Sequence, residues 1–292
     1  MMKVLLLLAV VLTVESCVPR YSPEPGCLCG VPGDKSRIVG GEDARSNQYP
    51  WQVGLMFTDQ DTESFCGGTL LSSDTVLTAA HCMFISPTVY VALPKGEITL
   101  ENATKIEASK ILVHPYFDFF TLNNDFAIIK LSRPVEQFDD STRPICLPDP
   151  TKSYDDNPAE VTGWGSVDVT NLISPENLQT LNVTTMNNKE CQDMFNNLPQ
   201  SVIDEFFAGT VNPITTNMLC AQHSTDAAKQ PYKGDSGGPL ITLNKEGSHY
   251  HQIGVVSWGL PGPTPGVFAR VTDQLYWIMK QVSGETCPPP SL

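Results

Sequence analysis

From residue 38 onward, the chain is a succession of short apolar stretches separated by turn residues. The clearest of them occupy residues 51–57, 68–77, 110–114, 126–131, 161–164, 240–243 and 253–258. Stretches of this length and spacing, with little helical periodicity between them, are typical of strands in an antiparallel sandwich or barrel. The sequence therefore predicts an all-β fold.

Two helices are expected within this strand-rich pattern. Apolar side chains near the C-terminus recur at helical spacing and predict an amphipathic helix: Val271, Leu275, Ile278 and Val282. Either Thr272 or Asp273 is available to cap it. A shorter helix is predicted over residues 201–207, capped by Ser201 and ending near Gly209, because its apolar residues form i,i+4 pairs.

Residues 1–16 have the pattern of a secretory signal peptide. A basic start at Lys3 precedes an apolar run over residues 4–14, which is shorter than the roughly 20 residues that span a bilayer. No later run approaches that length, so we expect an exported protein with no membrane association. Residues 17–37 are rich in Pro, Gly and Cys and are interpreted as a pro-segment, which leaves one folded domain over residues 38–292.

Cysteine usage and charge narrow the possible roles. The nine cysteines, at 17, 27, 29, 66, 82, 146, 191, 220 and 287, include no C-x-x-C pair, which favours disulfides over zinc. The sequons at Asn102 and Asn182 are candidate glycosylation sites. Acidic residues outnumber basic ones by 32 to 18, and the resulting net charge of −14 argues against a nucleic-acid partner.

Three motifs carry candidate chemistry. Gly-Asp-Ser-Gly-Gly-Pro at 234–239 sets Ser236 in a tight turn, where backbone N–H groups are free to face a developing oxyanion. Thr-Ala-Ala-His-Cys at 78–82 surrounds His81 with small residues that leave its ring accessible. Asp125 leads directly into an apolar stretch, so we expect its carboxylate to be partly buried and to need a donor, for which an imidazole N–H would serve.

The serine motif alone leaves two other interpretations open. It also fits the nucleophile elbow of α/β-hydrolases, although that fold needs alternating strands and helices, with its histidine after the serine. A simple Gly-Ser turn without catalytic meaning is the second.

Taken together, the motifs resemble the chymotrypsin family of secreted serine endopeptidases. Six blocks stand in the order of that family: Arg-Ile-Val-Gly-Gly at 37–41, the block at 78–82, Asp125 with its strand, Gly-Trp-Gly at 163–165, the block at 234–239, and Ser-Trp-Gly at 257–259. The resemblance covers residues 37 to about 283. It implies two packed six-stranded antiparallel β-barrels with the active site in the cleft between them.

The resemblance also implies the catalytic mechanism of that family. Ser236 would attack the peptide carbonyl, His81 would accept and later return the proton, and Asp125 would orient the imidazole. Backbone N–H groups of Gly234 and Ser236 would form the oxyanion hole. Nothing in the sequence requires a metal or an organic cofactor.

Further implied residues concern substrate binding and activation. Residues Ser257, Trp258 and Gly259 would bind the substrate backbone as an added strand. A trypsin-like protease would cut Arg37–Ile38, and the freed ammonium of Ile38 would pair with Asp235, so the protein is expected to be made as a zymogen. Its other expected partners are protein or peptide substrates and protein inhibitors.

The specificity pocket departs from the family pattern. Trypsin-like members place an Asp six residues before the nucleophile, where this chain has Gln230. Gly259 and Gly266 match the open walls of the family pocket. We therefore expect cleavage after large apolar or neutral residues rather than basic ones. A disulfide that usually joins the pocket walls is missing, because Tyr232 stands in the first cysteine position and residues 260–263 contain no cysteine.

Three disulfides and one insertion complete the comparison with the family. The implied pairs are Cys66 with Cys82, Cys191 with Cys220, and Cys146 with either Cys27 or Cys29. Cys191 and Cys220 enclose 28 residues, about twice the usual content. The extra segment, within residues 195–217, is expected to overhang one rim of the cleft, either as a barrier or docking surface or as a locally packed insertion without a role.

A catalytically silent homologue that acts as a binding or cofactor protein is the rival interpretation. The retained His81, Asp125, Gly234 and Ser236 argue against it, whereas the missing pocket disulfide and the long insertion are in its favour.

Overall fold

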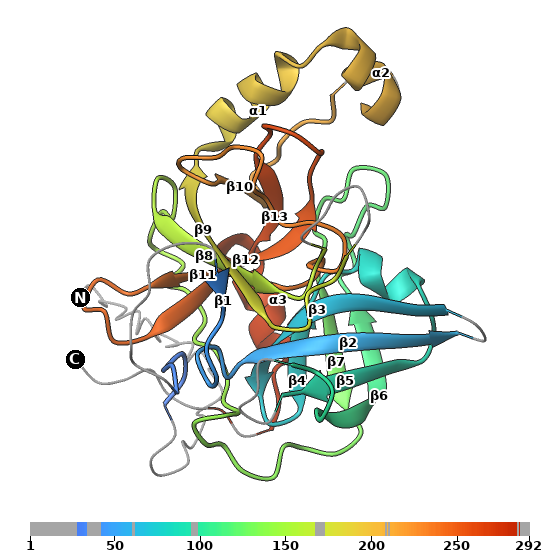
Figure 1. Ribbon diagram of the computed structural model, residues 1–292, viewed down its shortest axis with the longest axis vertical. Coiled ribbons are helices and arrows are strands. Elements are labelled where there is room, and N and C mark those ends of the chain that lie inside the picture. Colours follow the sequence, from blue (N-terminus) through green and yellow to red (C-terminus); the bar gives the residue numbers. More distant parts are fainter. Residues whose placement is uncertain are drawn as a thin grey trace, which may run out of the picture.

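Strands from the first half of the chain close into a six-stranded antiparallel barrel, the N-terminal barrel (Figure 1). In barrel order the strands are β2 (Gln52–Asp59), β3 (Thr62–Ser72), β4 (Thr75–Thr78), β7 (Ala127–Leu131), β6 (Thr104–Val113) and β5 (Val89–Leu93). Its core includes the fully buried side chains of Leu55, Leu77, Phe126 and Ile128.

The second half forms the C-terminal barrel. In sheet order its strands are β9 (Gln179–Met186), β10 (Met218–Gln222), β13 (Gly266–Arg270), β12 (Tyr250–Trp258), β11 (Pro239–Leu243) and β8 (Pro158–Gly163). Strand β8 pairs with both β11 and β9 and so closes the ring, while the short β1 (Glu42–Asp43) adds to β9 from outside. The expected pair of antiparallel barrels is confirmed.

This computed structural model describes residues 28–33, 42–59, 62–94, 99–166, 173–207, 209, 211–284 and 286. The predicted signal peptide, the Arg37–Ile38 bond and the cysteines at 17, 27 and 287 lie outside these residues.

The C-terminal helix is confirmed as α3 (Val271–Gln281), but its predicted cap is wrong. The N-cap is Arg270, whose side chain makes no capping bond. The guanidinium of Arg270 instead donates to the Met218 carbonyl and to Asn188 Oδ1, at 2.9 Å each. The helix starts where strand β13 ends, so this tertiary anchor sets its beginning one residue before Thr272.

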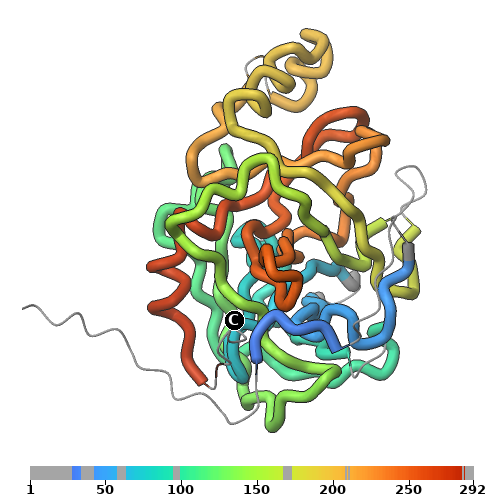
Figure 2. Tube along the Cα trace, turned by 90° about the vertical axis from the view of Figure 1, so that its left-hand side faces the viewer, coloured from blue at the N-terminus to red at the C-terminus, as the bar shows by residue number. Residues whose placement is uncertain are grey.

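Two further helices fill the insertion between β9 and β10. Helix α2 (Gln200–Phe207) confirms the helix predicted over residues 201–207, and Gly209 follows it with φ of +95°. Its predicted cap is wrong, because Ser201 lies inside the helix, whose first turn bonds to the Pro199 carbonyl. Helix α1 (Asn188–Asn196) was not predicted, although Asn187 caps it by accepting the N–H of Glu190 at 2.9 Å. Both views show α1 and α2 projecting from one end of the molecule (Figures 1 and 2).

All three expected disulfides are present in the described residues. They join Cys66 to Cys82, Cys191 to Cys220, and Cys29 to Cys146. Of the two partners left open for Cys146, the structure selects Cys29. The neighbouring Gly30 donates to the Pro144 carbonyl at 2.9 Å and accepts the Tyr250 N–H at 2.8 Å. Residues 28–33 are therefore fixed to β12 of the C-terminal barrel and to the segment at residues 144–146.

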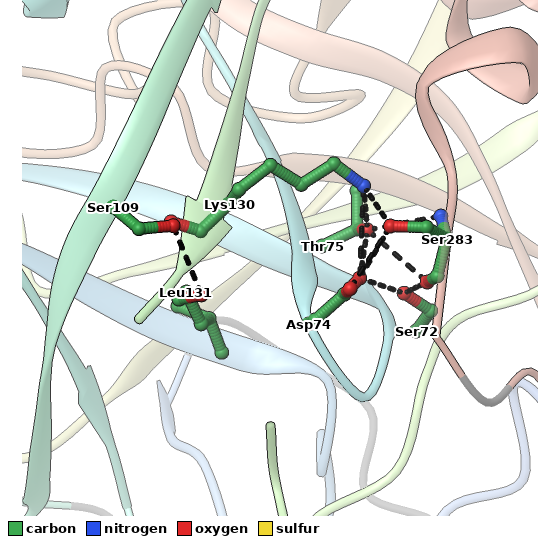
Figure 3. A network of polar contacts seen from close by, with 7 residues as sticks. All are labelled: Ser72, Asp74, Thr75, Ser109, Lys130, Leu131 and Ser283. Atoms are coloured by element: carbon green, nitrogen blue, oxygen red, sulfur yellow. Dashed lines mark hydrogen bonds and ion pairs between the residues drawn. The ribbon is translucent and has the colours of Figure 1, made fainter. Parts of the chain in front are cut away.

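A polar network fixes the end of α3 to the N-terminal barrel (Figure 3). The turn at residues 73–74 divides the apolar stretch 68–77 into β3 and β4, so that stretch is not one strand. The Asp74 carboxylate accepts from Thr75 Oγ1 at 2.6 Å and from Ser283 Oγ at 2.9 Å. Lys130 Nζ on β7 donates to Thr75 Oγ1 at 2.7 Å and to Ser283 Oγ at 2.6 Å.

The charge of Asp74 should stabilise the fold in a pH-dependent way. Burial alone would raise the pKa of Asp74, but the hydrogen bonds from Thr75 and Ser283 and the charge of Lys130 outweigh it and lower the pKa below 3.8. Its contribution is thus present at neutral pH and lost as the pH falls below 3.8. We expect Asp74→Asn to reduce the free energy of unfolding by about 1 kcal/mol at pH 7.

Urea denaturation of both proteins from pH 7 to pH 3 measures this difference, which should shrink at the acid end. Asp140→Asn is the control, since Asp140 forms a surface ion pair with Arg143 and its side chain is 77% exposed. A difference for Asp74→Asn that is independent of pH would contradict the assignment to its charge.

Candidate active site

A fully buried carboxylate, Asp125, lies where the two barrels meet. Its Oδ1 accepts the backbone N–H of His81 at 2.9 Å, and its Oδ2 lies 2.7 Å from His81 Nδ1. Ser257, on β12 of the other barrel, donates its hydroxyl to Oδ2 at 2.6 Å. An ionised carboxylate only accepts, so Nδ1 is the donor in this pair, and in a neutral imidazole Nε2 is then the accepting nitrogen. Nε2 lies 3.8 Å from Cys82 Sγ.

The backbone of His81 is fixed, whereas its ring remains accessible to solvent. His81 begins the 3₁₀ helix η1 (His81–Phe84), which follows β4 after two residues. The next residue, Cys82, is buried and bonded to Cys66 on β3. The His81 side chain keeps 22% exposure, so the ring combines a fixed backbone with a solvent-facing edge.

The turn that carries Ser236 is docked onto the N-terminal barrel through glycines. Gly67 on β3 donates its N–H to the Ser236 carbonyl at 2.7 Å, and Cys82 Sγ lies 3.7 Å from the same oxygen. Gly237 has φ of +79°, and a Cβ there would lie 2.2 Å from Thr78 Oγ1. A larger residue at 237 would push the turn away, so the close approach of Ser236 to the His81 segment requires glycine.

The carboxylate of Asp235, beside Ser236, points into a cradle of glycines. It accepts the N–H of Gly165 at 2.8 Å and that of Tyr232 at 2.9 Å. A Cβ at Gly163 would lie 2.0 Å from this carboxylate, which leaves room for it only next to glycine. Burial raises the pKa of Asp235 to about 6 against those two hydrogen bonds. It forms no ion pair with a described residue, so the site would favour an added cation.

Gln230 links the two walls of the candidate specificity pocket. Its Nε2 donates to the Leu260 carbonyl and, at 3.2 Å, to the Gly262 carbonyl. A flipped amide would set its oxygen against two carbonyl oxygens, so this orientation follows from the hydrogen bonds. Gln230 Oε1 is buried without a partner among the described residues, 3.0 Å from where a Cβ of Gly259 would stand.

This arrangement takes the place of the missing pocket disulfide. A Cβ at Gly259 would also lie 3.7 Å from the Gly266 Cα, so Gln230, Gly259 and Gly266 meet in space as expected. The amide of Gln230 crosslinks the segments that a disulfide between position 232 and residues 260–263 would have joined. No local pattern in the sequence reveals this second role of Gln230.

The insertion packs against the ring of Trp258, the middle residue of the expected substrate-binding segment 257–259. The ring of Trp258 is 5.1 Å from that of Phe195 on α1 and 6.1 Å from that of Phe207 on α2. Further along, Thr215 Oγ1 lies 2.7 Å from Asn123 Oδ1, two residues before Asp125. The insertion is therefore packed locally and also reaches the rim of the candidate site.

Comparison with known proteins agrees with this geometry. Residues 38–278 match the family model described as Trypsin. The chain belongs to the trypsin family. It is also 34% identical over 267 residues to serine protease filzig of Drosophila melanogaster, an alignment that covers 87% of this chain. The chain spans only 15% of the length of that relative. This family membership supports a serine protease.

Two remaining features bear on location. The sequon residue Asn102 is exposed in the connection between β5 and β6, whereas Asn182 is half-buried within β9. In the stretches that the structure describes, no helix has both the length and the apolar character needed to span a membrane.

Removing the hydroxyl of Ser257 tests how the buried carboxylate is held. Ser257→Ala leaves Oδ2 of Asp125 with one donor fewer, and we expect the free energy of unfolding to fall by about 1–3 kcal/mol. Thermal or urea denaturation gives the value. Ser109→Ala is the matched control, since this exposed hydroxyl donates to the carbonyls of Lys130 and Leu131 at 3.1 Å, and we expect a change within about 0.5 kcal/mol. Equal effects of the two substitutions would contradict the role assigned to Ser257.

Proposed function

We propose that this chain is a secreted serine endopeptidase that hydrolyses peptide bonds through an acyl-enzyme. The observation that carries the proposal is the hydrogen-bonded pair of His81 and Asp125 beside the glycine turn of Ser236, in a chain of the trypsin family. Secretion is supported by the signal-like residues 1–16 and by the three disulfides. The exposed Asn102 is the better candidate for a glycan.

The proposed reaction follows from the orientation of the His81 ring, whose Nδ1 faces Asp125. Its Nε2 lone pair accepts the proton of Ser236 Oγ as this oxygen attacks the scissile carbonyl, and the imidazolium then gives the proton to the leaving amine. Asp125 stabilises the imidazolium without taking its proton. A water molecule, activated by the same nitrogen, hydrolyses the acyl-enzyme. The N–H groups of Gly234 and Ser236 bind the oxyanion, and each is worth about 3 kcal/mol in the transition state.

Activation is proposed to occur by cleavage at Arg37–Ile38. The support is the half-buried Asp235, whose pKa desolvation raises to about 6 and whose carboxylate lacks an ion pair with a described residue. A new ammonium at Ile38 would supply the missing cation and fix the turn that contains Gly234 and Ser236. An activating trypsin-like protease is thus a proposed partner, as are protein inhibitors that occupy the cleft.

The proposed substrate preference follows from the amide of Gln230. The amide is neutral and offers no counter-ion to Lys or Arg. Large apolar or neutral side chains therefore suit this pocket better than guanidinium or ammonium groups.

Labelling by a fluorophosphonate probe tests nucleophile and activation together. We expect no labelling of the intact chain, and labelling after limited trypsin treatment produces an Ile38 N-terminus, verified by mass spectrometry. Ser236→Ala should abolish it, because the probe bonds covalently to the nucleophilic oxygen. Asp235→Asn should reduce it strongly after the same cut, since the amide cannot pair with an ammonium.

The control for Asp235 is Asp226→Asn, an exposed acid on the same loop, which should label like the unmodified chain. If the cut chain with a verified Ile38 terminus is not labelled, the peptidase proposal is wrong and a silent homologue is supported.

Substitution of Gln230 tests the pocket. Gln230→Asp places a carboxylate beside Gly259 and Gly266, and we expect the preferred residue before the scissile bond to shift from neutral side chains toward Lys and Arg, by at least tenfold in kcat/KM. A peptide-library profile of the activated proteins measures this shift. Gln222→Asp is the control. Gln222 lies at the end of β10, and its Nε2 donates to the Pro263 carbonyl at 3.4 Å instead of bridging the pocket walls at Leu260 and Gly262. A profile of Gln230→Asp identical to that of the unmodified protein would show that Gln230 does not set the preference.

A further inference from the structure

The turn that leads into Asp125 has an unfavourable backbone conformation. Leu122 has φ of +53° and Asn124 has φ of +55°, both in the left-handed region that L side chains rarely adopt. Asparagine tolerates this region because its short polar side chain can make local hydrogen bonds, whereas leucine has no such compensation. A turn of this kind persists only where neighbouring groups hold it. The contacts of the turn therefore bear on how Asp125 is presented to His81.

The side chain of Asn124 belongs to a closed cycle of hydrogen bonds. Asn124 is buried, and its Nδ2 donates to the Tyr116 carbonyl at 2.9 Å. Its Oδ1 accepts from Gln274 Nε2 on α3 at 3.0 Å. Gln274 Oε1 lies 3.0 Å from Nε2 of the buried His114, and His114 Nδ1 accepts the Tyr116 N–H at 3.3 Å. We call these four residues the cyclic network, which starts and ends on the backbone of Tyr116.

The direction of each bond in the cyclic network follows from that backbone. The Tyr116 carbonyl only accepts, so the amide of Asn124 presents Nδ2 to it and Oδ1 to Gln274. Gln274 then donates from Nε2, which leaves its Oε1 to accept the Nε2–H of His114. The remaining nitrogen, His114 Nδ1, accepts the N–H of Tyr116. A flipped amide or the other tautomer would set two donors or two acceptors against each other, so the network has one arrangement.

The imidazole of His114 is uncharged in this arrangement, because its Nδ1 accepts a hydrogen bond. Burial lowers the pKa of His114, which agrees with a neutral imidazole at pH 7. Its ring packs against that of Trp277 on α3 at nearly right angles, with the centroids 4.6 Å apart. Packing and hydrogen bonds therefore fix His114 together.

The cyclic network joins the two barrels close to Asp125. Tyr116 and Asn124 belong to the connection between β6 and β7 of the N-terminal barrel, whereas Gln274 lies on α3, which follows β13 of the C-terminal barrel. Gln274 Nε2 also donates to Asn217 Oδ1 at 3.1 Å, where the insertion returns to β10. A side chain of α3 thus connects the turn before Asp125 to the other barrel.

Asn124 in turn sets the backbone on both sides of Asp125. The Asn124 carbonyl accepts the Phe126 N–H at 2.7 Å, which closes a tight turn around Asp125. Phe126 is fully buried, and its own carbonyl accepts the His114 N–H at 2.9 Å. The carboxylate of Asp125 contacts both the backbone N–H and the Nδ1 of His81. A shift of this turn would therefore loosen both contacts.

We propose that His114 and Gln274 are positioning residues for the proposed reaction, because through Asn124 they hold the turn that orients Asp125 toward His81. Their contribution lies in the geometry of the His81–Asp125 pair and not in substrate binding. Side chains that support a catalytic group by hydrogen bonds and packing keep it in its productive orientation. This inference rests on the proposed peptidase function.

Proton NMR of the full chain carrying Ser236→Ala measures the pair without any catalysis. The proton held between His81 Nδ1 and Asp125 gives a resonance far downfield of the backbone amides. We expect Gln274→Ala to shift this resonance or to broaden it beyond detection, because Asn124 Oδ1 loses its donor. Asn124→Gly should do the same. Glycine adopts a positive φ freely, so this second variant tests the side-chain bonds without adding backbone strain.

The rate of fluorophosphonate labelling measures the same effect in the activated chain with intact Ser236. Small displacements of catalytic groups are costly, so we expect roughly tenfold slower labelling of Gln274→Ala and of Asn124→Gly. Circular dichroism at the assay temperature verifies that each variant is folded. Gln281→Ala is the matched control, since this glutamine lies at the other end of α3, and it should change neither the resonance nor the rate.

The outcomes separate the positioning role from the peptidase. A downfield resonance that is unchanged in Gln274→Ala and in Asn124→Gly overturns the positioning role, as does its absence from the Ser236→Ala chain itself. Labelling of the two variants at the rate of the unmodified chain also overturns it. If the unmodified, activated chain is not labelled at all, the peptidase proposal is removed instead. The NMR comparison then decides by itself whether the cyclic network holds the pair.

Discussion

The buried carboxylate of Asp125 is the group on which the arrangement of this molecule depends. A buried charge without donors costs several kcal/mol, and breaking a buried pair costs about 3–5 kcal/mol. The donors of Asp125 come from two sources, the His81 segment of the N-terminal barrel and Ser257 of the C-terminal barrel. Satisfying this one carboxylate therefore requires the barrels to dock in a single relation, and the same relation orients the imidazole.

Two glycines allow the barrels to make close backbone contact near Ser236. Gly67 and Gly237 let the backbone of the Ser236 turn approach β3 and β4 more closely than any side chain would permit. The approach brings Ser236 into contact with the segment that carries Cys82 and His81. The position of Ser236 thus depends on backbone contact between the two barrels.

The fold and much of the site were predictable because their signals are local or belong to ordered motifs. Asp125 at the head of an apolar stretch predicted burial and a nitrogen donor. That Ser257 is a second donor could not be predicted, since it is 132 residues away and nothing near it in sequence indicates the contact. The predicted cap of α3 was wrong for a similar reason, because Arg270 is held by Met218 and Asn188, which are distant in sequence. Helix α1 was detectable, since Asn187 and Glu190 have capping-box spacing. The choice of Cys29 over Cys27 depends on the hydrogen bonds of Gly30, which only the fold defines.

The bond between Cys29 and Cys146 joins residues 117 positions apart, and so makes that part of the chain a covalent ring. Within a ring, one break in the backbone releases nothing: both pieces stay attached through sulfur. The break changes the unfolded state instead. A closed loop of about 100 residues removes roughly 4–5 kcal/mol of unfolded-chain entropy, and opening the ring returns that freedom. A single backbone cut at Arg37 would therefore keep both pieces in one molecule, heavier by one water. The unfolded chain would gain entropy, so the folded state would depend more on its non-covalent contacts for stability.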